Sequence, residues 1–370
     1  MRIRGRIAGV LFLTLPAVAS LVAASDIRGP LKDIAFIPAV TANEGDLTAK
    51  IATLLPEVIT TEVDNLGALY ARVGRGSPSL AVITGADEFG YVVSTITPDG
   101  FLRLDRGVPP PLALSDTFLL GRSVVIRTGS GTVAGVVSQP ALHLMTADSR
   151  DRFAKPLGLD LVYVDIGARS ADEVKARGIR ILDPVTWTPT LSELAKDRRA
   201  GPGLGRRAAC AALAAAAQDL GTLGSASVEL AWMAQSRVLV RGAKPSSLGA
   251  LRARNRLAAK SVIVLDSVPA GQAAGGPRLG GGLVIIKAQA GESRLAAALE
   301  TAAAALHLSI VQQTVADSPL LQPFLGPGGD AVILALPVRY AGTPSEVVDL
   351  KDVQAAADLI VELMKKGGLS

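Results

Sequence analysis

The sequence predicts an α/β protein in which helices cover a mostly parallel sheet and a β-rich segment interrupts the sheet domain. From about Leu191 onward, apolar strand-like runs alternate with alanine-rich helical runs, which is typical of a sheet with helices on both faces. Between Val92 and Pro189 the pattern changes to short β-type runs broken by "PDG", "GSG" and "PPP". The composition agrees, because 49% of the residues are apolar and alanine, valine, leucine and glycine dominate.

The first part of the sheet domain is predicted from residues 25–92. Residues 26–59 have the pattern of a helix, a loop and a second helix. Two strands follow, in "TTEVDNLGALYARVG" (residues 60–74) and in "PSLAVITG" (residues 78–85), separated by glycine and proline turns. Residues 93–189 are predicted to form the inserted β-rich domain.

The second part of the sheet domain is predicted from residues 190–370. Its helices are expected in "RAACAALAAAAQDL", "ESRLAAALETAAAALHL" and "VQAAADLIVELMKK". Its strands are expected in "SVELAWMAQ", "SVIVLDSV", "GLVIIKA" and "AVILALPV". The alternation of these runs predicts crossover connections and parallel pairing.

The N-terminus has the pattern of a secretory signal. "MRIRGRIAGVLFLTLPAVASLVAASD" places three arginines before an apolar stretch and small residues after it. We expect residues 1–24 to be a signal peptide, with cleavage before Ser25 or, as a second option, after Ala19. The protein is then exported to the periplasm or the outside, and an uncleaved signal would leave it anchored. No other apolar run has membrane-spanning length.

Charge and cysteine content exclude some functions. The net charge of +5 is mild for 370 residues, and the arginines are scattered in short clusters. Nucleic-acid binding needs a dense basic face with aromatic residues for stacking, so we expect no nucleic-acid partner. Cys210 is the single cysteine, which excludes an internal disulfide, and no histidine stands near it in the sequence to activate it.

The first candidate site follows the apolar run Leu80–Thr84. This run stops at Gly85 and is followed by two adjacent carboxylates, Asp87 and Glu88. Carboxylates at the end of a buried strand commonly line a cleft, where they serve a metal ion or a proton transfer. Both uses normally need partners such as histidine, and the chain has two histidines.

Five collinear motifs connect this stretch with a known family. They are "DNLGALYA", "ADEFGYVVSTITPDGFLRL", "VYVDIGARSADEVKARGIRILDPVTW", "VRGA" and "LPVRYAGTPSEVVDLKDV". On these motifs the chain resembles the glutamyl and deblocking aminopeptidases, two-zinc exopeptidases that include proteins once called endoglucanase M. The resemblance implies a zinc-aminopeptidase-like α/β domain interrupted by a β-rich dimerisation domain. It also implies a homo-oligomer, since family members assemble into large hollow tetrahedra.

The resemblance further implies two zinc or cobalt ions that activate a bridging water, with a carboxylate as base. The first histidine ligand corresponds to Gly85, two residues before the retained Asp87. The bridging aspartate corresponds to Gly205, and its neighbour is Arg206. Both ligand positions therefore lack a donor side chain.

The remaining positions are altered in the same way. A Glu-Glu pair of base and ligand corresponds to Ser236 and Arg237, and the last histidine corresponds to Gly342. Asp266, after "SVIVL", is the only surviving ligand position. Serine is a poor base and arginine a permanent cation, so we expect no catalytic set and no bound metal. His143 and His307 fall elsewhere in the sequence and are expected to be surface or packing residues.

Two arginines, Arg206 and Arg237, occupy positions at which the family has acidic residues. Two dications normally neutralise such a carboxylate cluster, and leaving the acids unpaired would be costly. We therefore predict that Arg206 and Arg237 reach into the pocket and pair with Asp87 or Asp266. Arginines that point to solvent would contradict this prediction.

Several functions remain open from the sequence. The first hypothesis is an exported, non-catalytic relative that acts as a scaffold or binding protein and assembles through its inserted domain. The alternative is a functioning metallo-aminopeptidase with atypical ligands. A third is a pocket for peptide carboxylates or other anions, built from Arg206, Arg207 and Arg237. A metal-free hydrolase using Ser236 is the weakest, because no histidine or lysine base accompanies that serine.

Overall fold

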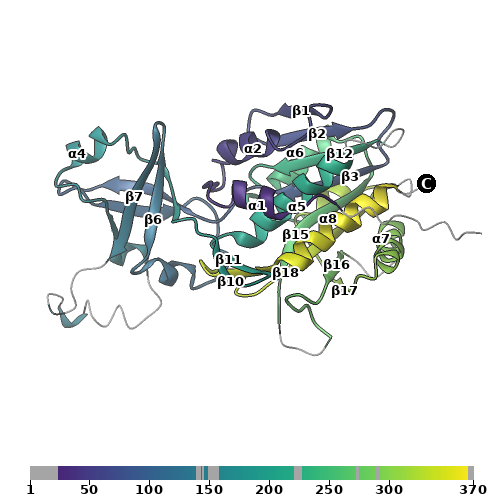
Figure 1. Cartoon of the computed structure of the whole chain (residues 1–370). Coiled ribbons are helices and arrows are strands. Elements are labelled where there is room, and N and C mark those ends of the chain that lie inside the picture. Colours follow the sequence, from purple (N-terminus) through teal and green to yellow (C-terminus); the bar gives the residue numbers. More distant parts are fainter. Residues whose placement is uncertain are drawn as a thin grey trace, which may run out of the picture.

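The computed structural model describes residues 24–138, 143, 146–148, 158–220, 227–271, 275–288 and 292–365. The predicted signal peptide lies outside the described residues, apart from Ala24. Figure 1 shows a body of sheet and helices with a β-barrel to one side of it. None of the helices in the described part of the chain is long and apolar enough to cross a membrane.

The body is built on an eight-stranded sheet. In spatial order its strands are β1 (Thr60–Val63), β2 (Leu69–Val73), β12 (Val228–Met233), β3 (Leu80–Gly85), β15 (Ser261–Pro269), β18 (Asp330–Val338), β16 (Leu283–Lys287) and β17 (Ile310–Thr314). The four strands expected in residues 190–370 are all present, as β12, β15, β16 and β18. Strand β17 was missed, because "IVQQT" is half polar and only partly buried.

The sheet is mixed rather than mostly parallel. Strands β12, β3, β15 and β18 run parallel to one another, as does β17 to β16, but β16 is antiparallel to β18 and both β1 and β2 are antiparallel to their neighbours. The stretch 60–74, predicted as one strand, is a hairpin. Its turn is closed by Asp64, whose carboxylate accepts hydrogen bonds from the N–H groups of Leu66 and Ala68. A hairpin forces antiparallel pairing, which periodicity alone does not reveal.

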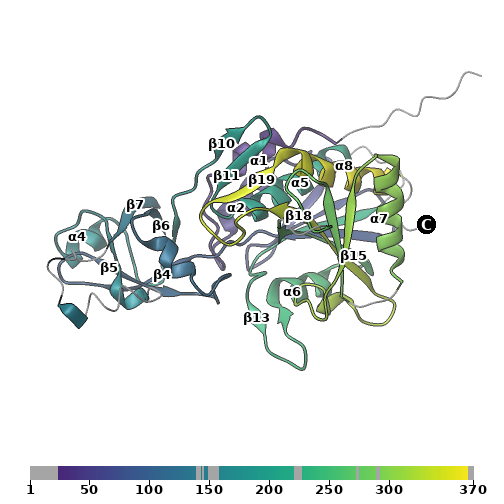
Figure 2. The same ribbon diagram turned by 90° about the horizontal axis from the view of Figure 1, so that it is seen from below.

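Helices cover both faces of the sheet, as expected. One face packs against α1 (Arg28–Ile34), α2 (Gly45–Ala52), α5 (Leu204–Leu220), α7 (Arg294–Ala305) and α8 (Leu350–Lys365). Helix α6 (Leu248–Arg256) packs on the other face, and Figure 2 shows it across the sheet from α5 and α8. The alanines of α5 are fully buried. Their small side chains allow α5 to lie close to the sheet, which brings its first turn to the ends of the central strands.

The chain between Tyr91 and Trp187 forms a closed six-stranded barrel. Around the barrel its strands are β4 (Tyr91–Ile96), β5 (Leu102–Arg106), β8 (Tyr163–Asp165), β7 (Gly131–Ser138), β6 (Ser123–Thr128) and β9 (Pro184–Trp187). Its core has its own apolar cluster, in which the rings of Phe89, Tyr91 and Trp187 meet edge to face or tilted. The short helix α4 (Ala171–Ala176) is capped by Ser170, whose hydroxyl accepts from the N–H of Glu173.

Two smaller sheets complete the described structure. Strands β10 (Ser192–Ala195), β11 (Arg198–Gly201) and β19 (Glu346–Asp349) form an antiparallel sheet between barrel and body. Strands β13 (Leu239–Val240) and β14 (Ser246–Ser247) form a hairpin that leads into α6. Strand β19 begins at Glu346, which lies beside the first turn of α5, and the strand is directly followed by α8.

Candidate functional site

The candidate site lies at the carboxyl ends of the parallel strands, where open α/β sheets usually bind ligands. Strand β3 ends at Gly85 and is followed by Asp87, while Ser236 and Arg237 follow the end of β12. Asp266 lies within β15, and Arg206 stands in the first turn of α5. The fold therefore brings residues from four separate elements to one place.

Asp87 is at the centre of this cluster and is fully buried. One of its oxygens accepts hydrogen bonds from the hydroxyl of Thr41 (3.0 Å) and the backbone N–H of Arg237 (2.9 Å). The other accepts a hydrogen bond from the hydroxyl of Ser236. Hydrogen bonds to both of its oxygens hold the Asp87 carboxylate in a fixed orientation.

Arg206 connects the cluster to Asp266. Its Nη1 donates to Ser236 Oγ at 2.6 Å and lies 3.8 Å from Asp87 Oδ1, and its Nε lies 3.2 Å from Asp266 Oδ1. Burial by itself would lower the pKa of Arg206, but the carboxylates of Asp266 and Asp87 outweigh it and raise that pKa. The guanidinium is thus a fixed cation shared by two acids and a hydroxyl.

The guanidinium of Arg206 occupies the space in front of Gly85. A Cβ atom on residue 85 would overlap Arg206 Nη1 and Ser236 Oγ and would lie 3.0 Å from Arg206 Cζ. The φ angle of Gly85 lies outside the left-handed region, so an ordinary residue could adopt this backbone. Glycine is required here because of Arg206, and any longer side chain at position 85 excludes that arginine from the pocket.

A second buried ion pair lies beside the first. Arg207 is 1% exposed, and its Nη2 lies 3.1 Å from Glu88 Oε2. Its guanidinium also donates to the carbonyl oxygens of Ala86 and Ile37. Arg207 is therefore held in the core by these contacts. The hypothesis that it contributes to an anion-binding pocket is not supported.

Glu346 in β19 joins two loops of the site and was not predicted from the sequence. Its carboxylate accepts hydrogen bonds from the backbone N–H groups of Gly205 (2.8 Å) and Gly342 (2.7 Å). Burial raises the pKa of Glu346, and these two hydrogen bonds act in the opposite direction. Gly205 also lacks room for a side chain, since a Cβ there would lie 2.9 Å from Ser267 Oγ.

The site falls within a region that matches one peptidase family. The sequence model of M42 glutamyl aminopeptidases matches residues 67–359. The chain belongs to the M42 glutamyl aminopeptidase family. The matched region runs from the turn of the β1–β2 hairpin into α8, and it includes the barrel and every site residue that the sequence predicted.

Relatives of this M42 chain extend over nearly its whole length. FrvX of Escherichia coli strain K12, a putative aminopeptidase, is 29% identical over 349 residues, which cover 89% of this chain and 92% of FrvX. The lysyl aminopeptidase of Pyrococcus furiosus is 26% identical over 310 residues, with 82% and 86% coverage. Among solved structures, the TET1 peptidase of Pyrococcus horikoshii superposes with a TM-score of 0.76 at 23% identity, covering 91% of this chain and 98% of that one. The M42 fold is therefore retained throughout.

The residues present do not fit the dinuclear metal centre that M42 membership suggests. Within the described ranges, no group of three His, Cys, Asp or Glu side chains is placed to hold a metal ion. Metal pairs need several oxygen or nitrogen ligands around each ion. Asp87 and Asp266 are instead both bonded to the Arg206 guanidinium, a cation that cannot ligate a metal.

The two histidines of this M42 chain lie away from the cluster, and its single cysteine lies beside the cluster but is buried. His143 and His307 are exposed, His143 beyond the end of β7 and His307 just after α7. Cys210 is buried in α5, and burial raises the pKa of its thiol to about 12. Its Sγ points to the carbonyl oxygen of Gly85, at 3.6 Å. A thiol with so high a pKa is not a nucleophile at neutral pH.

Arg237 differs from the sequence prediction. Only its backbone N–H bonds Asp87, and no ion pair or side-chain hydrogen bond of Arg237 is found among the described residues. Burial lowers the pKa of Arg237, and the nearby charge of Arg206 lowers it further. The two acids are already engaged by Arg206, Ser236 and Thr41, so they leave Arg237 without a carboxylate partner.

A small cavity of about 30 Å³ remains between Arg206 and the barrel, with room for roughly one or two water molecules. Its lining includes Arg206, Arg237, Ser267 and Glu346 from the body and Trp187 from β9. In this conformation the space is too small for a peptide. At the carboxyl ends of its parallel strands, this M42 chain thus has a closed polar cluster instead of an open cleft.

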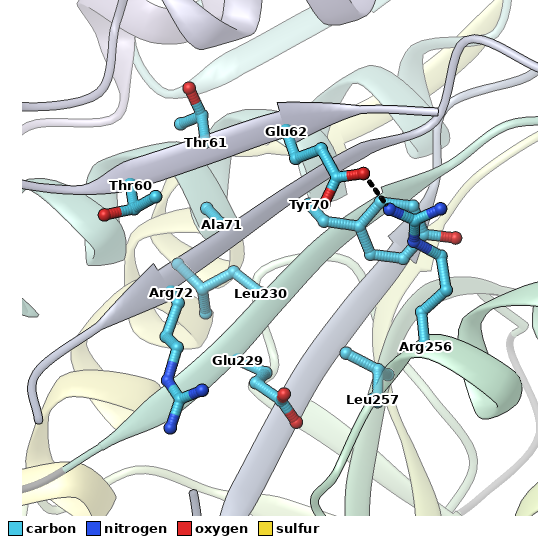
Figure 3. A pocket seen from close by; sticks show the side chains of 10 residues that line it. All are labelled: Thr60, Thr61, Glu62, Tyr70, Ala71, Arg72, Glu229, Leu230, Arg256 and Leu257. Carbon is cyan, nitrogen blue, oxygen red and sulfur yellow. Dashed lines mark hydrogen bonds and ion pairs between the residues drawn. The ribbon is translucent and has the colours of Figure 1, made fainter. Parts of the chain in front are cut away.

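A larger cavity, of about 430 Å³, lies at the other end of β12. Figure 3 shows the side chains that line it. Its lining includes Glu62 and Tyr70 of the β1–β2 hairpin, Glu229 at the start of β12 and Arg256 at the end of α6. Both acids are engaged, since Glu62 pairs with Arg256 and Glu229 accepts from the backbone N–H groups of residues 258 and 259. This cavity offers no free carboxylate for proton transfer, so the candidate site remains at the other end of the strands.

Glu44, at the start of α2, gives the site a predicted pH dependence. Burial, and next the charge of Asp87, raise the pKa of Glu44 from 4.5 to about 7. Its Oε1 accepts from the N–H groups of Gln235 (2.8 Å) and Ala42 (2.9 Å), while Oε2 has no partner. The folded state therefore holds a proton that the unfolded chain releases at lower pH.

Because its pKa is raised in the folded state, Glu44 contributes a stabilisation that is complete below pH 4.5 and is lost as the pH rises to about 7. For Glu44 the loss amounts to about 3 kcal/mol. We expect the free energy of unfolding of the wild type, relative to Glu44→Gln, to fall by that amount across this interval. Chemical denaturation at a series of pH values measures it. Parallel curves for the two proteins would show that Glu44 titrates normally.

Proposed function

We propose that this M42 protein is non-catalytic and that the Arg206 network stands where active relatives hold two metal ions. One observation carries the proposal: the Arg206 guanidinium fills the space in front of Gly85 while it bonds Asp87, Ser236 and Asp266. The resemblance assigns a metal-binding histidine to position 85. A histidine and this arginine cannot share that space.

The chemistry of the remaining groups agrees with this proposal. A dinuclear peptidase needs a base beside the metal-bound water, and Ser236 at that position already donates its hydrogen bond to Asp87. A free serine hydroxyl is not a base near neutral pH. Arg206 neutralises the acids in the way that dications would, so the fold keeps its strand ends together without metal.

We propose that the protein is exported and acts as a scaffold or binding protein. We further propose that the barrel is a domain inserted into the sheet domain and that the protein forms homo-oligomers through it. The TET1 peptidase of Pyrococcus horikoshii can assemble into a tetrahedron or a large octahedral shell. The barrel segment of the present chain also exposes several large apolar side chains, an arrangement that favours association. They are Leu112, Leu114, Leu120, Val136, Ile181 and Leu182. Export rests on the signal pattern of residues 1–24.

A peptidase assay tests the loss of catalysis. The purified chain, supplied with zinc or cobalt, is expected to release no N-terminal residues from a mixed set of peptides above the rate of a mock preparation. Asp266→Asn is the matched control, because it alters the one retained ligand position. Release that depends on added metal and disappears in this variant would establish the alternative, a functioning aminopeptidase with atypical ligands.

A further inference from the structure

Two donors of the small cavity at the strand ends lack acceptors. Trp187 is 6% exposed and lines this cavity, and its indole N–H has no hydrogen-bond partner. Arg237 lines the same cavity, and its buried Nε–H has no partner either. An unsatisfied buried donor destabilises the folded state, and a charged one does so more strongly. Both residues line one space of about 30 Å³, which has room for an acceptor.

The charges around the cavity favour an anion as that acceptor. Arg206 is paired with Asp266, and the two acids of the lining are engaged. Glu88 pairs with Arg207, and Glu346 accepts the backbone N–H groups of Gly205 and Gly342. Arg237 is the one cation of the lining that makes no ion pair among the described residues. Arg237 is only partly buried, and its guanidinium therefore remains available to an anion in the cavity.

We propose that this cavity binds a small monovalent anion, chloride or the carboxylate of a small acid, between the indole N–H of Trp187 and the guanidinium of Arg237. The small size of the cavity excludes bulky anions such as gluconate. Because Trp187 ends the barrel and Arg237 follows the sheet, the anion also ties barrel and body together. This proposal rests on the proposed function, since a metal pair would require Arg206 to leave the pocket.

Thermal unfolding of the full chain at constant ionic strength tests the proposal, with sodium chloride or sodium acetate replacing sodium gluconate, whose anion is too bulky for the cavity. A ligand that binds only the folded state raises its stability saturably. We expect a saturable rise in Tm with chloride, acetate or both, and the two titrations identify which anion fits. Arg237→Gln and Trp187→Phe should each weaken the apparent affinity at least tenfold. Arg241→Gln, an exposed charge change in the same segment, should leave it unchanged.

Arg237→Lys serves as a second variant if Arg237→Gln does not fold, because lysine keeps the charge but loses the Nε–H group. A wild-type Tm that does not respond saturably to either anion would overturn the proposal. So would a response that survives in both cavity variants. These failures would leave the proposed function intact, whereas tight zinc binding would overturn the proposed function itself.

Discussion

Replacing Gly85 with alanine is expected to lower the free energy of unfolding by about 3–5 kcal/mol, the cost of breaking a buried ion pair. The new Cβ overlaps the Arg206 guanidinium, which must leave Asp87 and Ser236. Backbone preference acts the other way, since alanine in a strand is favoured over glycine by about 0.5–1 kcal/mol. Steric overlap with a buried, bonded cation outweighs that gain. Urea denaturation of both proteins measures the difference.

Two further variants separate this cause from a general effect of the substitution. Gly29→Ala, in α1, places its Cβ in open space and should change stability by less than about 1 kcal/mol. In a protein that already carries Arg206→Ala, the Gly85→Ala substitution should cost far less, because the overlapping group is gone. A wild type that accepts Gly85→Ala without loss would contradict the position of Arg206.

Arg206→Met is expected to destabilise the protein by about 3–5 kcal/mol although it preserves much of the side-chain volume. The buried Asp87 and the partly buried Asp266 then lose their shared cation, while methionine offers no donor. The stability of the double variant Arg206→Met with Asp266→Asn should partly recover, because one uncompensated charge is removed. Equilibrium unfolding of the three proteins provides the measurement.

The matched control for this substitution is Arg28→Met. Arg28 pairs with Asp26 and with Asp197, and its own side chain is more than half exposed. Exposed ion pairs contribute about 0–1 kcal/mol, so this variant should unfold almost as the wild type does. Equal losses for Arg28→Met and Arg206→Met would show that the buried network contributes nothing specific.

The fold could be predicted further from the sequence than the site could. Buried strands such as β15 and β18 were evident from their apolar runs, because burial on both faces leaves a continuous signal. The direction of each strand in the sheet was not evident, because an apolar run has the same pattern whether it pairs with a parallel or an antiparallel neighbour. Strand β16 is therefore expected from its sequence but found in the opposite direction from β18.

At the site, motif positions located Gly85, Asp87 and Asp266 because these residues lie in or directly after strands that the family shares. Local sequence could not show that Glu346 would meet Gly205, 141 residues away, or that Arg207 would be buried. Arginine is normally exposed, and only the pairing with Glu88 makes its burial possible. The unpaired state of Arg237 depends on which acids Arg206 has already engaged, and no single-residue signal contains that information.

Metal content of the purified full-length chain tests most directly whether the Arg206 network has replaced the metal pair. After incubation with excess zinc and removal of free metal by gel filtration, we expect far less than one ion per chain. Arg206 already neutralises Asp87 and Asp266, and the described residues offer no third ligand beside them. About two tightly held zinc ions per chain, as a dinuclear site requires, would contradict this replacement.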